Sequence, residues 1–334
     1  MKKKTLRDIA YSVLDLSPIN EGSTAAESFK HTVGLAQHVE KWGYKRYWLA
    51  EHHNMPGIAS SATSILIGQV AAHTSTIRVG SGGIMLPNHA PLVIAEQFGT
   101  LESLFPGRID LGLGRAPGTD QLTAYALRRD RRSDGQDFPE QLAELQAYFN
   151  SEKLRVNAVP GRGLNIPIWL LGSSGFSAQL AGQLGLPFAF ANHFSPENTL
   201  PALALYRNSF RPSHLLKEPY TIIGSNIIAA DSDEEAKKLA TSLQQQHLAL
   251  IRNQPIPLQP PVDHIEALCS SYEHSILQQK LGGSIIGSPI TVKRKLEKFI
   301  EETQANEIMV NGQIYDHQSR LHSFEIVSKI IKNH

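Results

Sequence analysis

Residues 46–114 alternate between two kinds of apolar segment, and this alternation decides the fold. In order, the segments are RYWLA (46–50), SATSILIGQVAAHT (61–74), IRVGSGGIML (77–86), PLVIAEQFGTLESLF (91–105) and RIDLGLG (108–114). The first, third and fifth have the length and composition of strands, whereas the other two have the length of helices. The second helix ends at Pro106-Gly107, a helix stop signal. Strands that alternate with helices predict parallel βα units.

The same alternation runs through the rest of the chain. Further strands are predicted at 9–16, 167–171, 187–191, 220–230 and 307–314, which gives eight strands nearly all separated by helices. Eight βα units in one chain favour a closed (β/α)8 TIM barrel. An open doubly wound sheet would normally carry a Gly-rich phosphate turn after its first strand, and Ser17-Pro18-Ile19-Asn20 stands there instead.

Composition excludes several classes of protein. The chain has 334 residues, with 32 Lys plus Arg against 31 Asp plus Glu. A surface for nucleic acid needs a large positive excess, so we expect no such partner. No apolar run approaches the roughly 18 residues of a membrane span, and Arg7 and Asp8 follow the basic start where a signal peptide would be apolar. The single Cys269 excludes an intramolecular disulfide, and we expect a soluble cytoplasmic protein.

We expect one barrel domain over residues 1–334, interrupted twice. Residues 116–139 are polar and rich in Arg, Asp and Gly, which predicts a long, mobile active-site loop. Residues 251–287 begin with several prolines and break the βα pattern, which predicts an insertion. Because specificity in such barrels comes from loops, both segments are expected to influence the choice of substrate.

The polar residues at the carboxyl ends of strands are the candidates for chemistry, since barrel active sites form there. Glu51-His52-His53 follows the second strand, and a histidine at a strand end is a natural general acid or base. Side chains alternate along a strand, so only one histidine of the pair need face the pocket. Hydrogen bonding of both to the barrel rim is the simpler alternative. No metal site is expected, because a strand pair would need His-x-His spacing and a third ligand.

Two neighbouring strand ends suit a phosphate. Arg115 ends the fourth strand, and a guanidinium binds phosphate through its planar fork. Gly172-Ser173-Ser174-Gly175 ends the fifth strand and leads into a helix, whose free amides and dipole favour an anion. A rim salt bridge for Arg115 and an ordinary helix cap for the Ser-rich turn remain open. Ser288, at another helix start, competes for the same role.

Gly80, Gly82 and Gly83 interrupt the third strand. Glycines within a strand mark a bulge or a close approach of a ligand to the backbone. A flat cofactor with a phosphate tail, such as flavin mononucleotide (FMN), would account for Gly82-Gly83, Arg115 and Ser173 together.

Several motifs resemble the bacterial luciferase-like flavin monooxygenases, and they cover nearly the whole chain in the family's order. They are SVLDL (12–16), YWLAEHH (47–53), VGSGGIMLP (79–87), FPGRIDLGLGR (105–115) and GSP (287–289). The first resembles a subgroup of uncharacterised bacterial members.

The resemblance implies a barrel that uses FMN in its reduced form, FMNH2. Reduced flavin reacts with oxygen to give a C4a-hydroperoxide, which then oxidises a small organic substrate. His52 matches the family's acid/base histidine, Gly82-Gly83 matches a cis peptide under the flavin ring, and Arg115 and Ser173 match residues that hold the FMN phosphate. Asn192 and His193 fall where the family lines the flavin pocket. A separate flavin reductase and a homodimer are expected as well.

This sequence also departs from the family pattern. Gly114 stands at the position of the reactive luciferase cysteine, Phe176 replaces a hydroxyl residue of the phosphate loop, and 251–287 has no close likeness to luciferase. Light emission is therefore not implied. Three alternatives remain: a deazaflavin (F420)-dependent oxidoreductase without oxygen chemistry, a non-catalytic flavin-binding or subunit-partner protein, and, most weakly, a metal-dependent barrel hydrolase.

Overall fold

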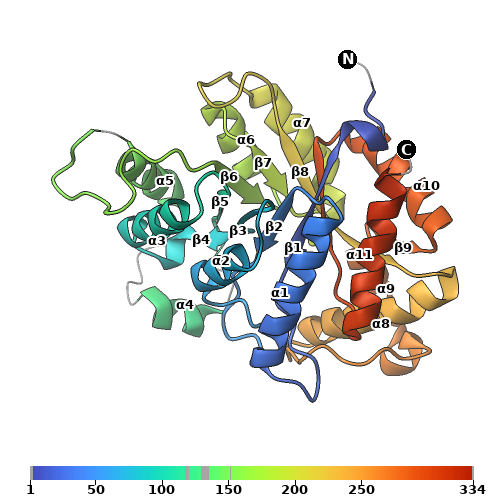
Figure 1. Cartoon of the computed structure of the whole chain (residues 1–334). Helices are drawn as coiled ribbons and strands as arrows, with labels where there is room; N and C mark the ends of the chain where they lie inside the picture. The colour runs from blue at the N-terminus through green and yellow to red at the C-terminus, as the bar shows by residue number, and fades with distance from the viewer. Residues whose placement is uncertain (1–2, 117–119, 129–134, 151, 333–334) are drawn as a thin grey trace.

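The structure is a computed structural model that describes residues 3–116, 120–128, 135–150 and 152–332. Within these residues, eight parallel strands form a closed barrel surrounded by helices (Figure 1). In the order of the ring, the strands are β10 (Glu307–Asn311), β1 (Ala10–Asp15), β2 (Arg46–Leu49), β3 (Arg78–Ser81), β5 (Ile109–Gly114), β6 (Ile168–Gly172), β7 (Phe188–Phe190) and β8 (Thr221–Ala229). The pairing of β8 with β10 closes the ring, which confirms the predicted TIM barrel.

Helices cover the outside of the barrel. They are α1 (Ala25–Lys41), α2 (Thr63–Ala72), α3 (Pro91–Leu104), α4 (Gln121–Arg128), α5 (Phe138–Phe149), α6 (Gly175–Leu184), α7 (Thr199–Ser209), α8 (Asp233–Ile251), α9 (Ser271–Leu281), α10 (Pro289–Thr303) and α11 (His317–Lys332). Short 3₁₀ turns occur at η1 (Leu6–Asp8), η2 (Leu86–Asn88), η3 (Pro196–Asn198) and η4 (Ile265–Leu268). Helix α1 (blue) packs beside α11 (red), so the first and last parts of the chain meet on the barrel surface (Figure 1). In the part of the chain that the structure describes, no helix is both long and apolar enough to cross a membrane.

The third predicted strand is broken in the middle. Residues 77–86 form β3 and a separate short strand, β4 (Ile84–Met85), which pairs with the end of β5. Between them lies a cis peptide bond at Gly82–Gly83, the bond that the resemblance implied.

The prediction of a continuous loop at 116–139 is wrong for residues 121–128, which form α4. Residues 117–119 and 129–134 of this segment lie outside the described residues, and the mobility of the segment stays a prediction. Sequence patterns favoured a loop because the segment is polar, and α4 buries only Ala124. The sequence of α4 therefore gives little of the apolar signal by which a helix is predicted.

The segment 251–287 is more regular than its prolines indicated. It contains η4, α9 and β9 (Ile285–Gly287), and β9 extends the sheet by pairing with the distal part of β8. Helix α9 begins with a capping box in which Ser270 and Glu273 bond each other's backbone amides. This Ser-x-x-Glu pattern is a helix start signal that the sequence carried and the prediction missed.

The barrel interior is built in layers, because side chains alternate between the lumen and the helices along each strand. An apolar layer lines the lumen: Leu14, Leu16, Trp48, Ala50, Trp169, Ala189, Ile222 and Met309. Below it, at the amino ends of the strands, a buried ionic network fills the base. Arg46 bonds Asp110 at 2.6 Å and Glu307 at 3.0 Å, and Arg78 bonds the second oxygen of Asp110 at 2.7 Å. The base is thereby closed, and the open space lies at the carboxyl ends.

We expect Arg46→Met to lower the free energy of unfolding by about 3–5 kcal/mol, because it leaves two buried carboxylates without their shared cation. Urea unfolding measures the change. The control is Lys329→Met, which removes an exposed ion pair with Glu325 and should cost less than about 1 kcal/mol. A loss in Arg46→Met no larger than in the control would contradict the structural role of the network.

Candidate active site

A cavity opens at the carboxyl ends of the strands and contains about 1050 Å³ of space free of protein atoms, its mouth included. We call it the Arg115 cavity. It brings together all of the predicted site residues except Gly175 and Asn192: His52, Gly82, Gly83, Arg115, Gly172, Ser173, Ser174 and His193. These residues come from the ends of different strands and are far apart in the sequence. Their convergence in one cavity is what the barrel topology predicts.

One end of the cavity has the features of an anion site. Ser174 is the N-cap of α6, but its side chain makes no capping hydrogen bond to the first turn of the helix. Arg115 lines the same cavity, and its Cζ lies 4.3 Å from the centre of the Phe176 ring. The Phe176 ring thus supports the guanidinium through a cation–π contact. First-turn amides and a guanidinium at one end of a cavity suit a phosphate group.

The helix start at Ser288, the alternative phosphate site, already binds a carboxylate of the protein itself. The Ser288 backbone N–H donates to the Asp233 carboxylate at 2.6 Å, and Thr291 donates to the other oxygen of the same carboxylate at 3.0 Å. An internal carboxylate thus caps α10, and a phosphate there would meet like charge.

Only one histidine of the pair after β2 faces the cavity, as the alternation of side chains along a strand predicted. His52 lines the cavity and His53 does not. The Glu51 carboxylate bonds other groups and not the His52 ring. Glu51 is buried and accepts hydrogen bonds from His53 Nε2 and His89 Nε2, both at 2.9 Å, and from the Met85 amide at 3.0 Å. The backbone N–H of His52 donates to Ser60 O at 3.2 Å, while its Nδ1 has no hydrogen-bond partner among the described residues.

Burial and charge set the protonation of this cluster. Burial alone would raise the pKa of Glu51, but the hydrogen bonds from His53 and His89 outweigh it and lower the pKa to about 2. Burial lowers the pKa of His52 to about 4, because the attraction of the Glu51 carboxylate does not offset the loss of water. His52 is therefore a neutral imidazole at pH 7, able to accept or donate one proton.

Gly82 and Gly83 form part of the cavity wall with their backbone. A Cβ on Gly83 would lie 2.6 Å from the Gly112 carbonyl oxygen, and one on Gly82 would lie 2.7 Å from Leu14 Cδ1. The backbone contact requires glycine at position 83, whereas at position 82 the Leu14 side chain would have to move. Since glycine has no side chain, the backbone of both residues is what the cavity meets here.

Two predicted residues lie outside this cavity. Asn192 is buried, and its side chain accepts a hydrogen bond from Thr199 at 2.9 Å and donates to Ser225 at 3.5 Å. These two hydrogen bonds hold the loop after β7. They do not indicate that Asn192 contacts a cofactor. Gly175 is the first residue of α6 and contributes backbone to the helix start only.

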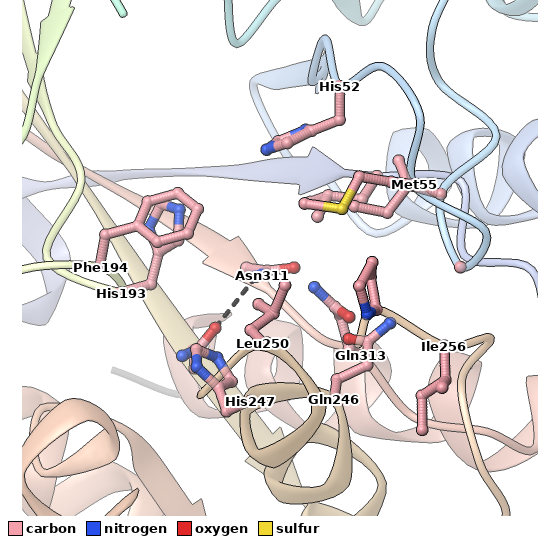
Figure 2. A pocket seen from close by; sticks show the side chains of 15 residues that line it. His52, Met55, His193, Phe194, Gln246, His247, Leu250, Ile256, Asn311 and Gln313 are labelled. Carbon is pink, nitrogen blue, oxygen red and sulfur yellow. Dashed lines mark hydrogen bonds between the residues drawn. The ribbon is translucent and has the colours of Figure 1, made fainter. Parts of the chain in front are cut away.

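A second, smaller cavity adjoins the first, and the two share Leu16, His52, His193 and Phe194. We call it the Gln313 cavity (Figure 2). Its other polar residues are Asn226, Gln246, His247, Asn311 and Gln313. Sequence reasoning missed all of them. Asn311 is the last residue of β10 and Gln313 lies two residues beyond it, so the strand-end rule would have found both if it had been applied to that strand. His247 lies within α8, where no sequence signal distinguishes it from a surface residue.

Among the described residues, no cluster of three or more His, Cys, Asp or Glu side chains is arranged to hold a metal ion.

Comparison with known proteins places the chain in a family. A family model described as luciferase-like monooxygenase matches residues 9–307. The chain belongs to the luciferase-like monooxygenases. A protein of that name from Escherichia coli (strain K12) is 56% identical over 328 residues, 98% of each chain. N-acetyl-S-alkylcysteine monooxygenase from Bacillus subtilis (strain 168) is 34% identical and aligns with 97% of this chain and 98% of its own. The crystal structure of apo-MsnO8 matches 97% of this luciferase-like monooxygenase and 98% of its own chain, with a TM-score of 0.87 and 33% identity.

We expect Glu51→Gln to lower the free energy of unfolding of this luciferase-like monooxygenase by about 3 kcal/mol at pH 7. The pKa of the folded protein's Glu51 lies below its ordinary value of 4.5, so its stabilisation is complete above that pH and is lost as the pH falls toward 2. The difference between wild type and variant should therefore narrow between pH 5 and pH 3. Urea unfolding at several pH values measures it.

The control for this experiment is Glu302→Gln, which changes an exposed carboxylate on α10. It should alter stability little at any of these pH values. If Glu51→Gln lowered the free energy of unfolding by the same amount at every pH, the charge of the Glu51 carboxylate would not be the source of the stabilisation.

Proposed function

We propose that this protein is an FMNH2-dependent monooxygenase that oxidises a small organic molecule. The observation that carries the proposal is that one cavity holds an anion site, Arg115 with the start of α6, and a neutral histidine, His52, at the mouth of a single barrel. The backbone of Gly82 and Gly83 lies in the same wall. A flat ring with one phosphate on a short tail fits these three features.

The composition of the anion site favours a single phosphate. Arg115 is the one Arg or Lys among the described residues that line the cavity, and the uncapped first turn of α6 adds backbone donors beside it. A phosphate monoester can take both kinds of donor at once. A cofactor with a longer anionic tail would carry more charge than one guanidinium neutralises.

Reduced FMN, when bound, would supply oxygen activation through a C4a-hydroperoxide. The protein would exclude water, orient the flavin ring, and hold or accept a proton. His52 is buried and neutral, so it can hold one proton on a ring nitrogen and accept another at the free one. His193 lines both cavities, and it donates from Nδ1 to Gly224 O at 3.2 Å, which leaves its Nε2 as an acceptor. The proposal includes a separate flavin reductase as the source of FMNH2 and a homodimer as the assembly.

We expect Arg115→Ala to weaken FMN binding about tenfold to a hundredfold, since a hydrogen bond to a charged group contributes about 1.5–3 kcal/mol. Riboflavin binding should change little, because riboflavin lacks the phosphate. Fluorescence titration with both ligands measures the effect. Arg294→Ala, which removes an exposed guanidinium on α10, is the control and should affect neither ligand. Equal losses for FMN and riboflavin in Arg115→Ala would place the phosphate elsewhere.

We expect His52→Ala to fold, to bind FMN nearly as before, and to lose oxygenation by about 10²–10⁴-fold, the usual contribution of a positioned acid/base. Hydrogen peroxide should rise in its place, because oxygen would still be consumed without product. Product formation and peroxide release are measured together with a flavin reductase and NADH.

His53→Ala is the matched control for this experiment. Its ring donates to Glu51 and does not line the Arg115 cavity, so the substitution should reduce stability and spare turnover. If His53→Ala abolished turnover while His52→Ala did not, the acid/base role would belong to the Glu51 cluster. Full activity in both variants would contradict any acid/base role at this strand end.

A further inference from the structure

The Gln313 cavity is a compartment of its own beside the proposed flavin site. Figure 2 shows His52 and Met55 across the cavity from Asn311 and Leu250, with His193 and Phe194 at one end. Gln246, Gln313 and Ile256 lie at the other end (Figure 2). Because His52 and His193 line both cavities, a molecule here would lie next to a cofactor in the Arg115 cavity.

No charged side chain takes part in this wall. Among the described residues that line the cavity there is no Lys, Arg, Asp or Glu. The three histidines are neutral at pH 7. Burial is the main cause that lowers the pKa of each of His52, His193 and His247 to about 4. A carboxylate or an ammonium in this cavity would lose its water without gaining a counter-ion, which is costly.

Two amide oxygens in the cavity wall lack partners. Asn226 donates to Ser284 Oγ at 3.5 Å and accepts from Asn311 Nδ2 at 3.0 Å, the bond drawn in Figure 2. This chain of bonds fixes the Asn311 amide with its Oδ1 as the remaining acceptor. Asn311 Oδ1 and Gln313 Oε1 are buried, and neither has a hydrogen-bond partner among the described residues. A buried acceptor without a donor is unfavourable, so N–H donors on a ligand would relieve these two oxygens.

The rest of the wall is apolar, and part of it comes from the segment after α8. Met55 and Ile58 contribute from the loop after β2, Leu250 from the end of α8, and Pro255 and Ile256 from the 251–287 segment. The expectation that this segment influences the choice of substrate thus has a structural basis. An apolar skeleton of a few carbons would contact these side chains.

We propose that the Gln313 cavity receives the organic substrate and selects a small uncharged molecule that carries an amide N–H on an apolar skeleton. Asn311 and Gln313 accept the N–H, and Met55, Leu250 and Ile256 contact the skeleton. The inference rests on the proposed function, because the substrate must lie beside the flavin, but its test needs no flavin.

Three probes of similar skeleton separate charge from hydrogen bonding. Pentanamide has N–H donors and no charge, pentanoate has a charge and no donor, and N,N-dimethylpentanamide has neither. Ligand-observed NMR titration of the purified protein at pH 7 should show that pentanamide binds at least about tenfold more tightly than pentanoate. It should also bind more tightly than the dimethyl amide. Pentanoate binding as tightly as pentanamide would overturn the proposal.

Two variants locate the binding. Gln313→Leu should weaken pentanamide about threefold to tenfold, the value of one hydrogen bond, and leave the dimethyl amide unchanged. Ile256→Trp fills the cavity and should abolish binding of both amides. Ile290→Trp, at a position on α10 that is 82% exposed, is its control and should bind both normally. Thermal unfolding of each variant confirms that it is folded.

The two proposals fail in distinguishable ways. If pentanamide binds as described and FMN does not bind at all, the cavity is a substrate site and the flavin proposal is wrong. If FMN binds and Ile256→Trp leaves pentanamide affinity unchanged, the flavin proposal stands and the Gln313 cavity is not the site of the amide.

Discussion

The pairing of β10 with both β1 and β8 is the constraint on which the rest of the structure depends. It closes the sheet with every strand parallel, so all carboxyl ends meet at one mouth. His52, Arg115 and Gln313, which are spread over most of the chain, reach neighbouring cavities only because of this closure. Without the pairing of β8 with β10 the sheet would be open, with these two strands at opposite edges.

The layers inside the barrel then determine where chemistry is possible. The network of Arg46, Asp110 and Glu307 closes the base, and the apolar layer with Trp48 and Trp169 separates it from the mouth. Trp48 and Trp169 pack edge to face, with ring centres 5.4 Å apart. Buried charge is thus paired at the closed end, whereas the described residues that line the Arg115 cavity include one cation, Arg115, and the neutral His52 and His193. This separation is consistent with the two proposals, a phosphate beside Arg115 and an uncharged substrate in the adjoining cavity.

Much of the fold could be predicted because it depends on patterns that are local in sequence. Alternating apolar segments gave all eight barrel strands, and glycine spacing marked the break between β3 and β4. Helix α4 was missed because it buries almost nothing, and α9 because several prolines precede its capping box.

The site was predictable to the extent that strand ends determine it. The rule that active sites form at the carboxyl ends of strands located His52, Arg115 and Ser173. It could not predict that Asn192 bonds Thr199, or that Glu51 accepts hydrogen bonds from His53 and His89. Those partners come from loops whose paths no local pattern encodes. His247 reaches the Gln313 cavity only through the packing of α8 on the mouth, which is a property of the whole fold.

The central claim is that the Arg115 cavity is built for reduced FMN, and an anaerobic binding titration tests it most directly. The purified protein is titrated with FMNH2, oxidised FMN, FAD and F420, and the dissociation constants are compared at one ionic strength. The account predicts that FMNH2 binds more tightly than FAD or F420, because one guanidinium and one helix start match a single terminal phosphate. Binding of F420 at least tenfold tighter than FMNH2 would contradict it.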